Sequence, residues 1–275
     1  MKSQPGGCKA TLRAQSLPPS HEQTALRRLC LLAPLGLLMG GPGRAAQPPG
    51  RELRMAFGER IPPFCLPQTE SGIEVDVFRE ALAYKGYRLK PLFYPFARVP
   101  RAFKTGEVDA TMTDLGEDLG RQGGHYGDSA VLYDNVLISL QSRRLRIQKP
   151  EDLAGLSVIS FQGALRRFPE WLEPVHQAGR LVEINDQALQ VRTLMRGRYD
   201  LVLSDRSIFR YFSLQLRREG EALQPVTEHV FTVANPHDYR PVFRDARVRD
   251  DFNEGLRWLR STGRYKAIYE HYLAE

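Results

Sequence analysis

The chain has little cysteine and no long apolar run. Its 275 residues include three cysteines, Cys8, Cys30 and Cys65, and removal of the first 46 residues would leave Cys65 alone. No internal disulfide framework is then possible. The apolar stretch LCLLAPLGLLM, at 29–39, is shorter than the ~20 residues that cross a bilayer, and a proline and a glycine interrupt it. These shortages exclude a disulfide-stapled domain and a membrane-spanning helix at this stretch.

The sequence also lacks the motifs of common catalytic and metal sites. It contains no G-x-S-x-G elbow and no Walker phosphate loop. GPGRAA, at 41–46, matches a dinucleotide-binding fingerprint in form only, because it follows no expected strand. The histidines show no metal-ligand spacing; they are His21, His125, His176, His229, His237 and His271. We therefore expect no metal, no cofactor and no enzymatic activity.

The first 46 residues have the layout of a secretory signal. Residues 1–28 carry five basic side chains against one acidic one, the apolar stretch 29–39 follows, and small residues close the segment. We predict cleavage after Ala45 or Ala46 and a periplasmic location. The alternative is a buried N-terminal helix, which the flanking charges disfavour. Cys30 precedes the apolar core, which argues against a lipid anchor.

Much of the excess positive charge lies in that segment. The whole chain has a formal net charge of +7. Residues 1–46 hold six basic side chains and one acidic one, so 33 basic and 31 acidic residues remain without them, a net charge of +2. A nearly neutral chain lacks the electrostatic attraction that polyanion binding needs. We expect no nucleic-acid partner.

Beyond residue 46, segments with strand character alternate with segments that have apolar residues at helical spacing. The expected strands are 52–58, 88–94, 108–113, 135–141, 156–160, 201–204 and 229–235. The expected helices are 72–87, 98–106, 186–200, 205–220, 247–261 and 264–273, with a helical turn at 149–155. This alternation predicts an α/β fold with mainly parallel sheets.

Oppositely charged side chains follow two of the expected strands. Arg121 lies in the glycine-rich loop after 108–113, and Asp205 directly follows 201–204. Ligands of open α/β sheets bind beyond the carboxyl ends of strands. An arginine fork and a carboxylate placed there would pair with the two ends of a zwitterion. The local alternatives are a surface role for Arg121 and a helix N-cap for Asp205.

Six segments in order resemble the periplasmic solute-binding proteins of the polar amino-acid uptake family, bacterial extracellular solute-binding protein family 3. They are IPPF with GIEVDVFREALA (61–64 and 72–83), FARVPRAFKTGEVDATMT (96–113), YGDSAVLYDNVLISLQ (126–141), IQKPEDLAGLSVISFQGA (147–164), LMRGRYDLVLSD (194–205) and FNEGLRWLRSTGRYKAIYEHYL (252–273). The resemblance implies a type II periplasmic-binding-protein fold, with two α/β lobes joined by two crossover strands. It also implies a monomer that delivers a small solute to an ABC-transporter permease in the inner membrane, without a cofactor or a metal.

The resemblance also implies a ligand site. Phe96 stands at the position of the aromatic residue that stacks on the ligand side chain. Arg121 stands at that of the arginine that grips the α-carboxylate, and Asp205 at that of the acid that takes the α-ammonium. The predicted ligand-binding set is completed by Phe64, Asp114, Glu59 and Gly163. Plain packing in the core is the alternative for the two phenylalanines.

Three positions depart from the family pattern. Gly116 stands where a hydroxyl usually contacts the carboxylate, Asp114 replaces another small polar residue, and Leu165 stands where a threonine commonly follows the Q-G turn. The resemblance implies a small polar solute, an amino acid or a related carboxylate. The absence of half of the usual carboxylate-binding set argues against an ordinary L-amino acid.

The expected organisation is a lobe formed by 47–141 with 231–275 and a second lobe formed by 142–230. The ligand is expected between them, where closure would create the surface that a permease recognises. One alternative is an enzyme on the same fold, resembling cyclohexadienyl dehydratase, with Glu170 or Glu173 as its acid or base. Another is a sensory ligand-binding module.

Overall fold

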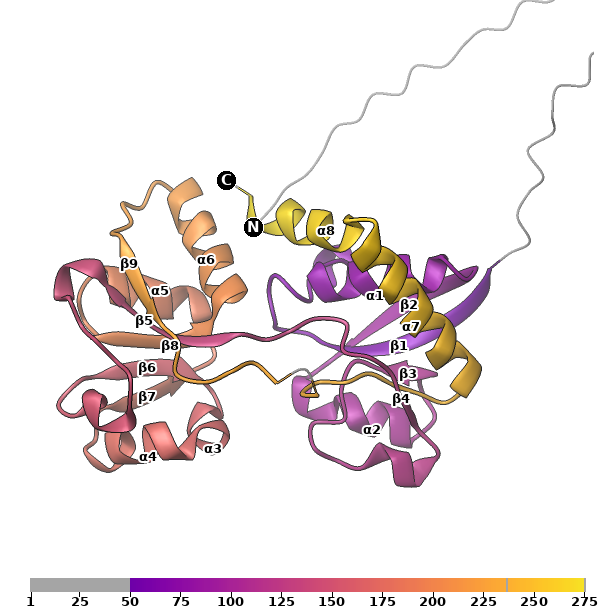
Figure 1. Cartoon of the computed structure of the whole chain (residues 1–275), viewed down its shortest axis with the longest axis horizontal. Coiled ribbons are helices and arrows are strands. Elements are labelled where there is room, and N and C mark those ends of the chain that lie inside the picture. Colours follow the sequence, from indigo (N-terminus) through magenta and orange to yellow (C-terminus); the bar gives the residue numbers. More distant parts are fainter. Residues whose placement is uncertain (1–49, 236, 275) are drawn as a thin grey trace, which may run out of the picture. The chain divides into compact units, whose positions relative to one another are not determined.

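The computed structural model describes residues 50–235 and 237–274, which contain two five-stranded sheets with helices packed on them (Figure 1). The predicted signal segment, 1–46, lies outside the described residues.

The first sheet has the strand order β2-β1-β3-β10-β4. Its strands are β1 (Arg51–Gly58), β2 (Tyr87–Tyr94), β3 (Ala110–Thr111), β4 (His125–Tyr126) and β10 (Val242–Phe243). β1 pairs in parallel with β2 and β3, whereas β10 runs antiparallel between β3 and β4. Met55, Ala56 and Phe57 are all fully buried. The end of β1 is therefore covered on both faces, which explains its continuous apolar run.

Four helices belong to this sheet: α1 (Ile73–Ala83), α2 (Val99–Lys104), α7 (Ala246–Ser261) and α8 (Arg264–Leu273). α1 packs against α7 and α8, although these lie at the far end of the sequence (Figure 1). The rings of Phe78 and Phe252 stack at 4.7 Å across the α1–α7 contact. A Cβ atom at Gly255 would lie 2.0 Å from the carbonyl oxygen of Ala81, so only glycine allows this approach.

The second sheet has the strand order β7-β6-β8-β5-β9. Its strands are β5 (Asn135–Leu140), β6 (Val158–Phe161), β7 (Leu181–Ile184), β8 (Leu201–Asp205) and β9 (Val226–His229). Alternate residues of the central strands face opposite sides of the sheet. Leu137 and Leu203 enter one buried cluster, while Ile138 and Val202 enter another.

Each cluster is closed by a pair of helices. α3 (Ala164–Arg167) and α4 (Pro169–Gln177) cover the face that holds Leu203, and α5 (Gln187–Met195) and α6 (Arg206–Arg218) cover the face that holds Val202 (Figure 1). Short 3₁₀ helices lie in the connections: η1 (Pro67–Thr69), η2 (Phe96–Arg98), η3 (Leu119–Gln122), η4 (Gln141–Arg143) and η5 (Pro150–Leu153).

The expectation of mainly parallel sheets is wrong, because both sheets are mixed. β10 in the first sheet and β5 and β9 in the second run antiparallel to their neighbours. β5 and β10 each follow a connection that crosses between the sheets. Hydrophobic periodicity reports a strand but not its direction, so the sequence pattern could not reveal this.

The strand expected at 229–235 is also wrong. β9 ends at His229, where its antiparallel pairing with β5 stops at Leu137. From Val230 onward the chain has left the sheet, and Val233 is 89% exposed. The apolar appearance of this segment comes in part from Phe231, whose ring packs edge-on against Phe168 at 5.0 Å.

Sequence reasoning assigned no element between 162 and 180, where α3 and α4 lie, or to β7. Pro169 occupies the first turn of α4, a position where its fixed φ is tolerated, and Pro174 lies within the helix. Two prolines and little apolar periodicity concealed these elements.

Candidate functional site

Three of the predicted ligand-binding residues follow strands of the first sheet and lie at the carboxyl ends of those strands. Glu59 directly follows β1, Phe96 follows β2, and Asp114 follows β3. The parallel register pairs Gly58 with Tyr94, so β1 and β2 end together. The carboxyl ends of three neighbouring parallel strands therefore present these side chains at the same edge of the sheet.

The second sheet repeats this placement. Gly163 follows β6 by two residues, and Asp205 is the last residue of β8, which is the parallel neighbour of β6. Gly163 has a φ of +91° as it begins α3, a conformation that favours glycine. Both sheets thus carry predicted ligand-site residues at the ends where open α/β sheets bind ligands.

Four aromatic side chains from four chain segments meet in what we call the aromatic cluster: Phe64, Phe96, Tyr133 and Tyr239. The ring centroids of Phe64 and Tyr133 lie 4.4 Å apart, those of Tyr133 and Tyr239 5.0 Å, and those of Phe96 and Tyr239 6.3 Å. Phe64 is fully buried and packs as part of the core, whereas Phe96 is half-buried. The cluster therefore brings together two predicted residues and two that sequence reasoning did not select.

Asp205 is 3% exposed, and its carboxylate accepts hydrogen bonds from the start of α6 and from the residue before β5. Oδ1 accepts hydrogen bonds from the backbone N–H groups of Ser207 and Ile208, at 2.8 and 3.0 Å, and so caps α6. Oδ2 accepts from the N–H of Asp134 at 2.7 Å, just before β5. Burial raises the pKa of Asp205 to about 7, although these hydrogen bonds oppose the shift. The N-cap role and the predicted ligand role are compatible, because a carboxylate has about four lone-pair sites.

Glu74 is a second buried acid, on the first turn of α1, and it is 1% exposed. Its Oε2 accepts a hydrogen bond from the Tyr133 hydroxyl at 2.9 Å, while its Oε1 is buried without a hydrogen-bond partner. Burial raises the pKa of Glu74 to about 8, against the opposing effect of the Tyr133 hydrogen bond. At neutral pH most of this side chain is therefore protonated and uncharged.

Arg167 reaches the aromatic cluster from the end of α3. Its guanidinium donates to the Tyr239 hydroxyl at 2.9 Å and to Asp238 Oδ2 at 2.6 Å. It also lies over the Tyr239 ring, 4.9 Å from the centroid, and 5.4 Å from that of Phe168. The side chain is 27% exposed, and its Nε is buried without an acceptor.

Arg121 lies elsewhere, on η3. Its side chain is 87% exposed, and Nε pairs with Asp118 at 2.9 Å. Asp114, from the same loop, accepts a hydrogen bond from the Tyr126 hydroxyl at 2.6 Å. Among the described residues, no hydrogen bond or ion pair joins Arg121 to Asp205 or to the aromatic cluster. The structure groups Phe64 and Phe96 with the aromatic cluster, and it leaves Arg121 at the surface.

Glu59 lines a cavity of about 240 Å³ at the carboxyl ends of β1 and β7. The cavity is lined by Glu59, Arg60, Pro62, Cys65, Leu66, Pro67, Gln68, Asn185, Asp186, Gln187 and Phe212. Glu59 is the only predicted residue among them. Cys65 is fully buried and unpaired.

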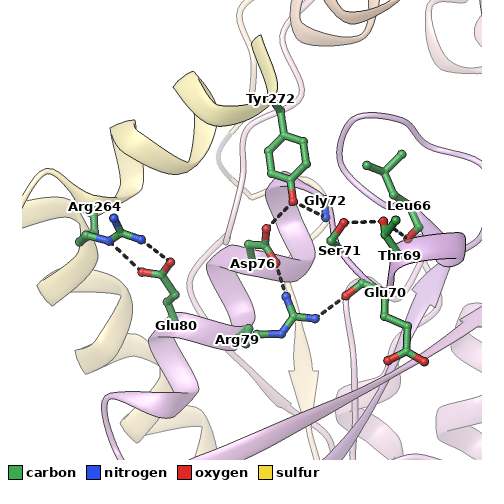
Figure 2. Close-up of polar contacts among 10 residues, drawn as sticks. All are labelled: Leu66, Thr69, Glu70, Ser71, Gly72, Asp76, Arg79, Glu80, Arg264 and Tyr272. Carbon is green, nitrogen blue, oxygen red and sulfur yellow. Dashed lines mark hydrogen bonds and ion pairs between the residues drawn. The ribbon is translucent and has the colours of Figure 1, made fainter. Parts of the chain in front are cut away.

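Polar contacts with α1 and α8 hold the base of the loop that carries Phe64 (Figure 2). The Tyr272 hydroxyl accepts from the N–H of Gly72 at 2.9 Å and donates to Asp76. Arg79 reaches from α1 to Asp76 and to the carbonyl of Glu70. A Cβ atom at Gly72 would lie 2.3 Å from the carbonyl oxygen of Phe64, so only glycine fits here. These contacts fix the position of Phe64 relative to α1.

The residues of the enzyme alternative lie outside the aromatic cluster. Glu170 is exposed on the first turn of α4, and Glu173 accepts a hydrogen bond from Gln177 at 3.0 Å. No group of three or more possible metal ligands occurs within residues 50–235 and 237–274. None of the helices in the same ranges is both long and apolar enough to span a bilayer.

Glu74, Tyr133, Arg167 and Tyr239 were missed by sequence reasoning. Arg167 follows the predicted site residue Gly163 by four residues. Its closeness to the carboxyl end of an expected strand could therefore have marked it as a candidate site residue. Glu74 occupies a buried position of α1 between Ile73 and Val75, and an acid between two apolar residues is a second signal. Tyr239 lies on an irregular segment, and no periodicity marks it.

Buried acids and aromatic rings near the carboxyl ends of strands are typical of small-molecule sites in α/β proteins. The fold and the site therefore indicate a small-molecule binding protein. The family model for bacterial extracellular solute-binding proteins, family 3, matches residues 53–275. The chain belongs to this family, and its role is to bind a solute. A search of curated proteins gave no significant match.

Solved structures show the same fold. Substrate-binding domain 2 of Lactococcus lactis GlnP, in an open conformation, has a TM-score of 0.60 at 19% identity, over 84% of this chain and 98% of that one. An ancestral arginine-binding protein bound to glutamine has a TM-score of 0.56 at 20% identity, over 82% and 98%. A histidine kinase sensor domain with similarity to periplasmic binding proteins has a TM-score of 0.56 at 21% identity, over 82% and 97%. The fold is that of type II periplasmic binding proteins, as predicted.

Proposed function

We propose that this protein captures an amino acid or a related carboxylate and delivers it to an ABC-transporter permease. Family membership supplies the solute-binding role. Support for the solute class comes from structural neighbours, among them a Streptococcus pneumoniae amino-acid ABC transporter substrate-binding protein bound to L-arginine. Its TM-score is 0.57 at 13% identity, over 81% of this chain and 94% of that one.

The observation that carries the proposal is the buried carboxylate of Asp205. It ends a central strand, and it accepts a hydrogen bond from the N–H of Asp134, the residue next to Tyr133 of the aromatic cluster. A ligand ammonium would supply the counter-charge that this carboxylate lacks. Phe96 would pack on the ligand side chain, and Glu59 and Gly163 would line the site from the first and second sheets. Asp114 would contribute through the loop after β3, and Arg121 is the arginine that the family resemblance assigns to the carboxylate.

The predicted lobes are 47–141 with 231–275, and 142–230, but β5 pairs with β8 and β9 in the second sheet, so we move the first boundary to a point before Asn135. Closure of the lobes around the solute would occur in the two connections between the sheets, from β4 to β5 and from β9 to β10, and the closed form is the one that a permease would recognise. The layout of residues 1–46 supports cleavage after Ala45 or Ala46 and export to the periplasm. The family resemblance implies that the exported protein is a monomer. Mass spectrometry of the exported protein tests this, and retention of Met1 would refute it.

A thermal-shift screen tests the proposed function. The panel consists of the twenty standard amino acids, their decarboxylated amines, and small mono- and dicarboxylates. A ligand at 100 times its dissociation constant adds ~2.7 kcal/mol to the free energy of unfolding, which raises the melting temperature measurably. We expect at least one amino acid or carboxylate to do so. If only amines stabilise the protein, the proposed solute class is wrong.

A sensory role is the second candidate, because the fold is shared with a histidine kinase sensor domain. The two roles predict the same ligand-binding screen but different partners. Copurification of the liganded protein with an inner-membrane permease favours uptake, and copurification with a histidine kinase favours sensing.

A further inference from the structure

Arg167 has the features of a ligand-binding residue that neither the sequence pattern nor the family resemblance selected. It lies at the end of α3, the short helix that begins at the carboxyl end of β6. Its guanidinium is oriented by the hydroxyl and the ring face of Tyr239 and by the carboxylate of Asp238. Since α3 packs on the second sheet and Tyr239 packs on Phe96 of the first, Arg167 joins groups from both.

One donor of this guanidinium has no acceptor. Nε is buried, and no hydrogen-bond partner exists for it within the described residues. A buried donor left unpaired is unfavourable, so such groups in native proteins call for an explanation. A ligand acceptor is one explanation, and the place of Arg167 beside the aromatic cluster supports it.

The charges around the aromatic cluster bear on which ligand group could accept a hydrogen bond from Arg167 Nε–H. Burial raises the pKa of Glu74 to about 8, so this acid is mostly uncharged at neutral pH and does not repel an anionic ligand group. Asp205 would repel one when it is ionised, and the charge of Asp238 is paired with Arg167. Arg167 is the guanidinium that contacts the cluster directly. Arg121 and Arg167 are each paired with an acid, Asp118 and Asp238, but Arg121 is exposed whereas Arg167 is half-buried.

We infer that Arg167, the half-buried arginine stacked on Tyr239 with a free Nε–H, receives the carboxylate of the solute. This inference rests on the proposed function and names the residue that determines its substrate class. The carboxylate accepts from Nε–H, while Tyr239 and Asp238 hold the guanidinium plane. Arg167 thereby discriminates amino acids from the corresponding amines, which lack the carboxylate.

Calorimetric titration of four proteins tests this inference. The proteins are wild type, Arg167→Ala, Arg167→Lys and Arg166→Ala, each checked for a cooperative melt. The probes are the amino acids that stabilise the wild type in the screen, each paired with its decarboxylated amine. Arg166 is the matched control, because it lies on the same helix and carries the same charge but is exposed.

In Arg167→Ala we expect the amino acid to bind at least about 30-fold more weakly, because a half-buried charged partner is lost. The amine should bind almost as it does to wild type, so the preference for the carboxylate disappears. Arg167→Lys should restore little of it, because an ammonium lacks the planar fork. Arg166→Ala should retain the preference.

Equal binding of the amino acid to wild type and Arg167→Ala would overturn the inference while leaving the proposed function intact. An equal loss in Arg166→Ala would also overturn it, since net charge rather than the Arg167 fork would then be the cause. Absence of any amino-acid or carboxylate binding to wild type would refute the proposed function itself. If Arg167→Ala does not fold, Arg167→Gln, which keeps the length of the side chain, replaces it with the same expected loss of preference.

Discussion

Two regions of the molecule contain the same chemical groups in different surroundings. The loop after β3 combines an arginine, an acid and a tyrosine in Arg121, Asp118 and Tyr126, and its arginine is exposed. At the aromatic cluster, Arg167 forms an ion pair with Asp238 and donates a hydrogen bond to the Tyr239 hydroxyl. Here the arginine is half-buried, and two further acids, Glu74 and Asp205, are almost entirely removed from water.

The difference shows where binding energy can arise in this fold. Exposed ion pairs contribute about 0–1 kcal/mol, because water and salt screen them. Charged hydrogen bonds in a poorly hydrated site are stronger, and unpaired groups there are more costly. We therefore locate the solute at the aromatic cluster and treat the loop after β3 as its rim. The predictions below test this contrast, from the largest expected effect to the smallest.

The largest expected effect is a loss of stability with rising pH. The pKa of Glu74 is about 8 in the folded protein, against a reference value of 4.5, so the folded state keeps a proton that the unfolded chain releases. The free energy of unfolding must then fall as pH rises through this window, by up to about 1.4 kcal/mol per pH unit. Asp205 adds a fall of the same sign between about pH 4 and 7. Thermal melts from pH 5 to 8 measure it.

Glu74→Gln isolates the contribution of this acid. The amide resembles the protonated form and does not titrate, so the fall in stability should become shallower, and the variant should gain on wild type as the pH approaches 8. Glu117→Gln, at an exposed position of the loop after β3, is the control and should follow wild type. The same slope in Glu74→Gln as in wild type would show that Glu74 does not titrate in this range.

The second effect is a loss of stability when Asp205 is truncated. Asp205→Ala leaves the N–H groups of Asp134, Ser207 and Ile208 without their acceptor. We expect a cost of about 3 kcal/mol in urea unfolding, from the lost cap and the unpaired buried donors.

Asp186→Ala is the matched control, because Asp186 caps α5 with an exposed side chain and should cost only about 1 kcal/mol. Asp205→Asn keeps one acceptor, which can still cap α6, but its amide NH2 then faces the N–H of Asp134. It should therefore lose part of the stability that Asp205→Ala loses, and it should bind amino acids more weakly. Equal costs for Asp205→Ala and Asp186→Ala would remove the contrast between the buried and exposed regions.

The smallest effect is expected at Arg121. An exposed residue paired with Asp118 should contribute little, so Arg121→Ala should change the affinity for an amino acid by less than about fivefold. Calorimetry beside Arg167→Ala measures the difference. A loss of about 30-fold or more in Arg121→Ala would return to Arg121 the role that the family resemblance implies for it.

The sequence predicted the α/β class and most helices, because their apolar periodicity and glycine stops are local properties. It also placed Asp205 and Phe96 at the ends of strands, since the pattern revealed those strands. Strand direction was not predictable in this way. The antiparallel β5 and β10 depend on where the chain returns after crossing between sheets, and that is a property of the whole fold.

The remaining site residues depend on contacts between distant segments. Tyr239 lies in an irregular segment and meets Tyr133 only through the tertiary fold. Arg167 stands beside Arg166 in the sequence, and nothing in the local pattern distinguishes the two. Burial separates it from Arg166, and burial of a single long side chain leaves no periodic trace in the sequence.

The most direct test counts protons while an amino acid binds. At pH 7 about half of the molecules hold a proton on Asp205, because burial raises the pKa of this side chain to about 7. A ligand ammonium favours the charged carboxylate, so binding should release about half a proton per molecule. Calorimetric titrations at pH 7 in two buffers of different ionisation enthalpy measure this number. We predict release in wild type and in Arg121→Ala, and a smaller release in Asp205→Asn, where Glu74 still holds a proton beside Tyr133. An undiminished release in Asp205→Asn, or no release in wild type, would contradict capture of the solute at the aromatic cluster.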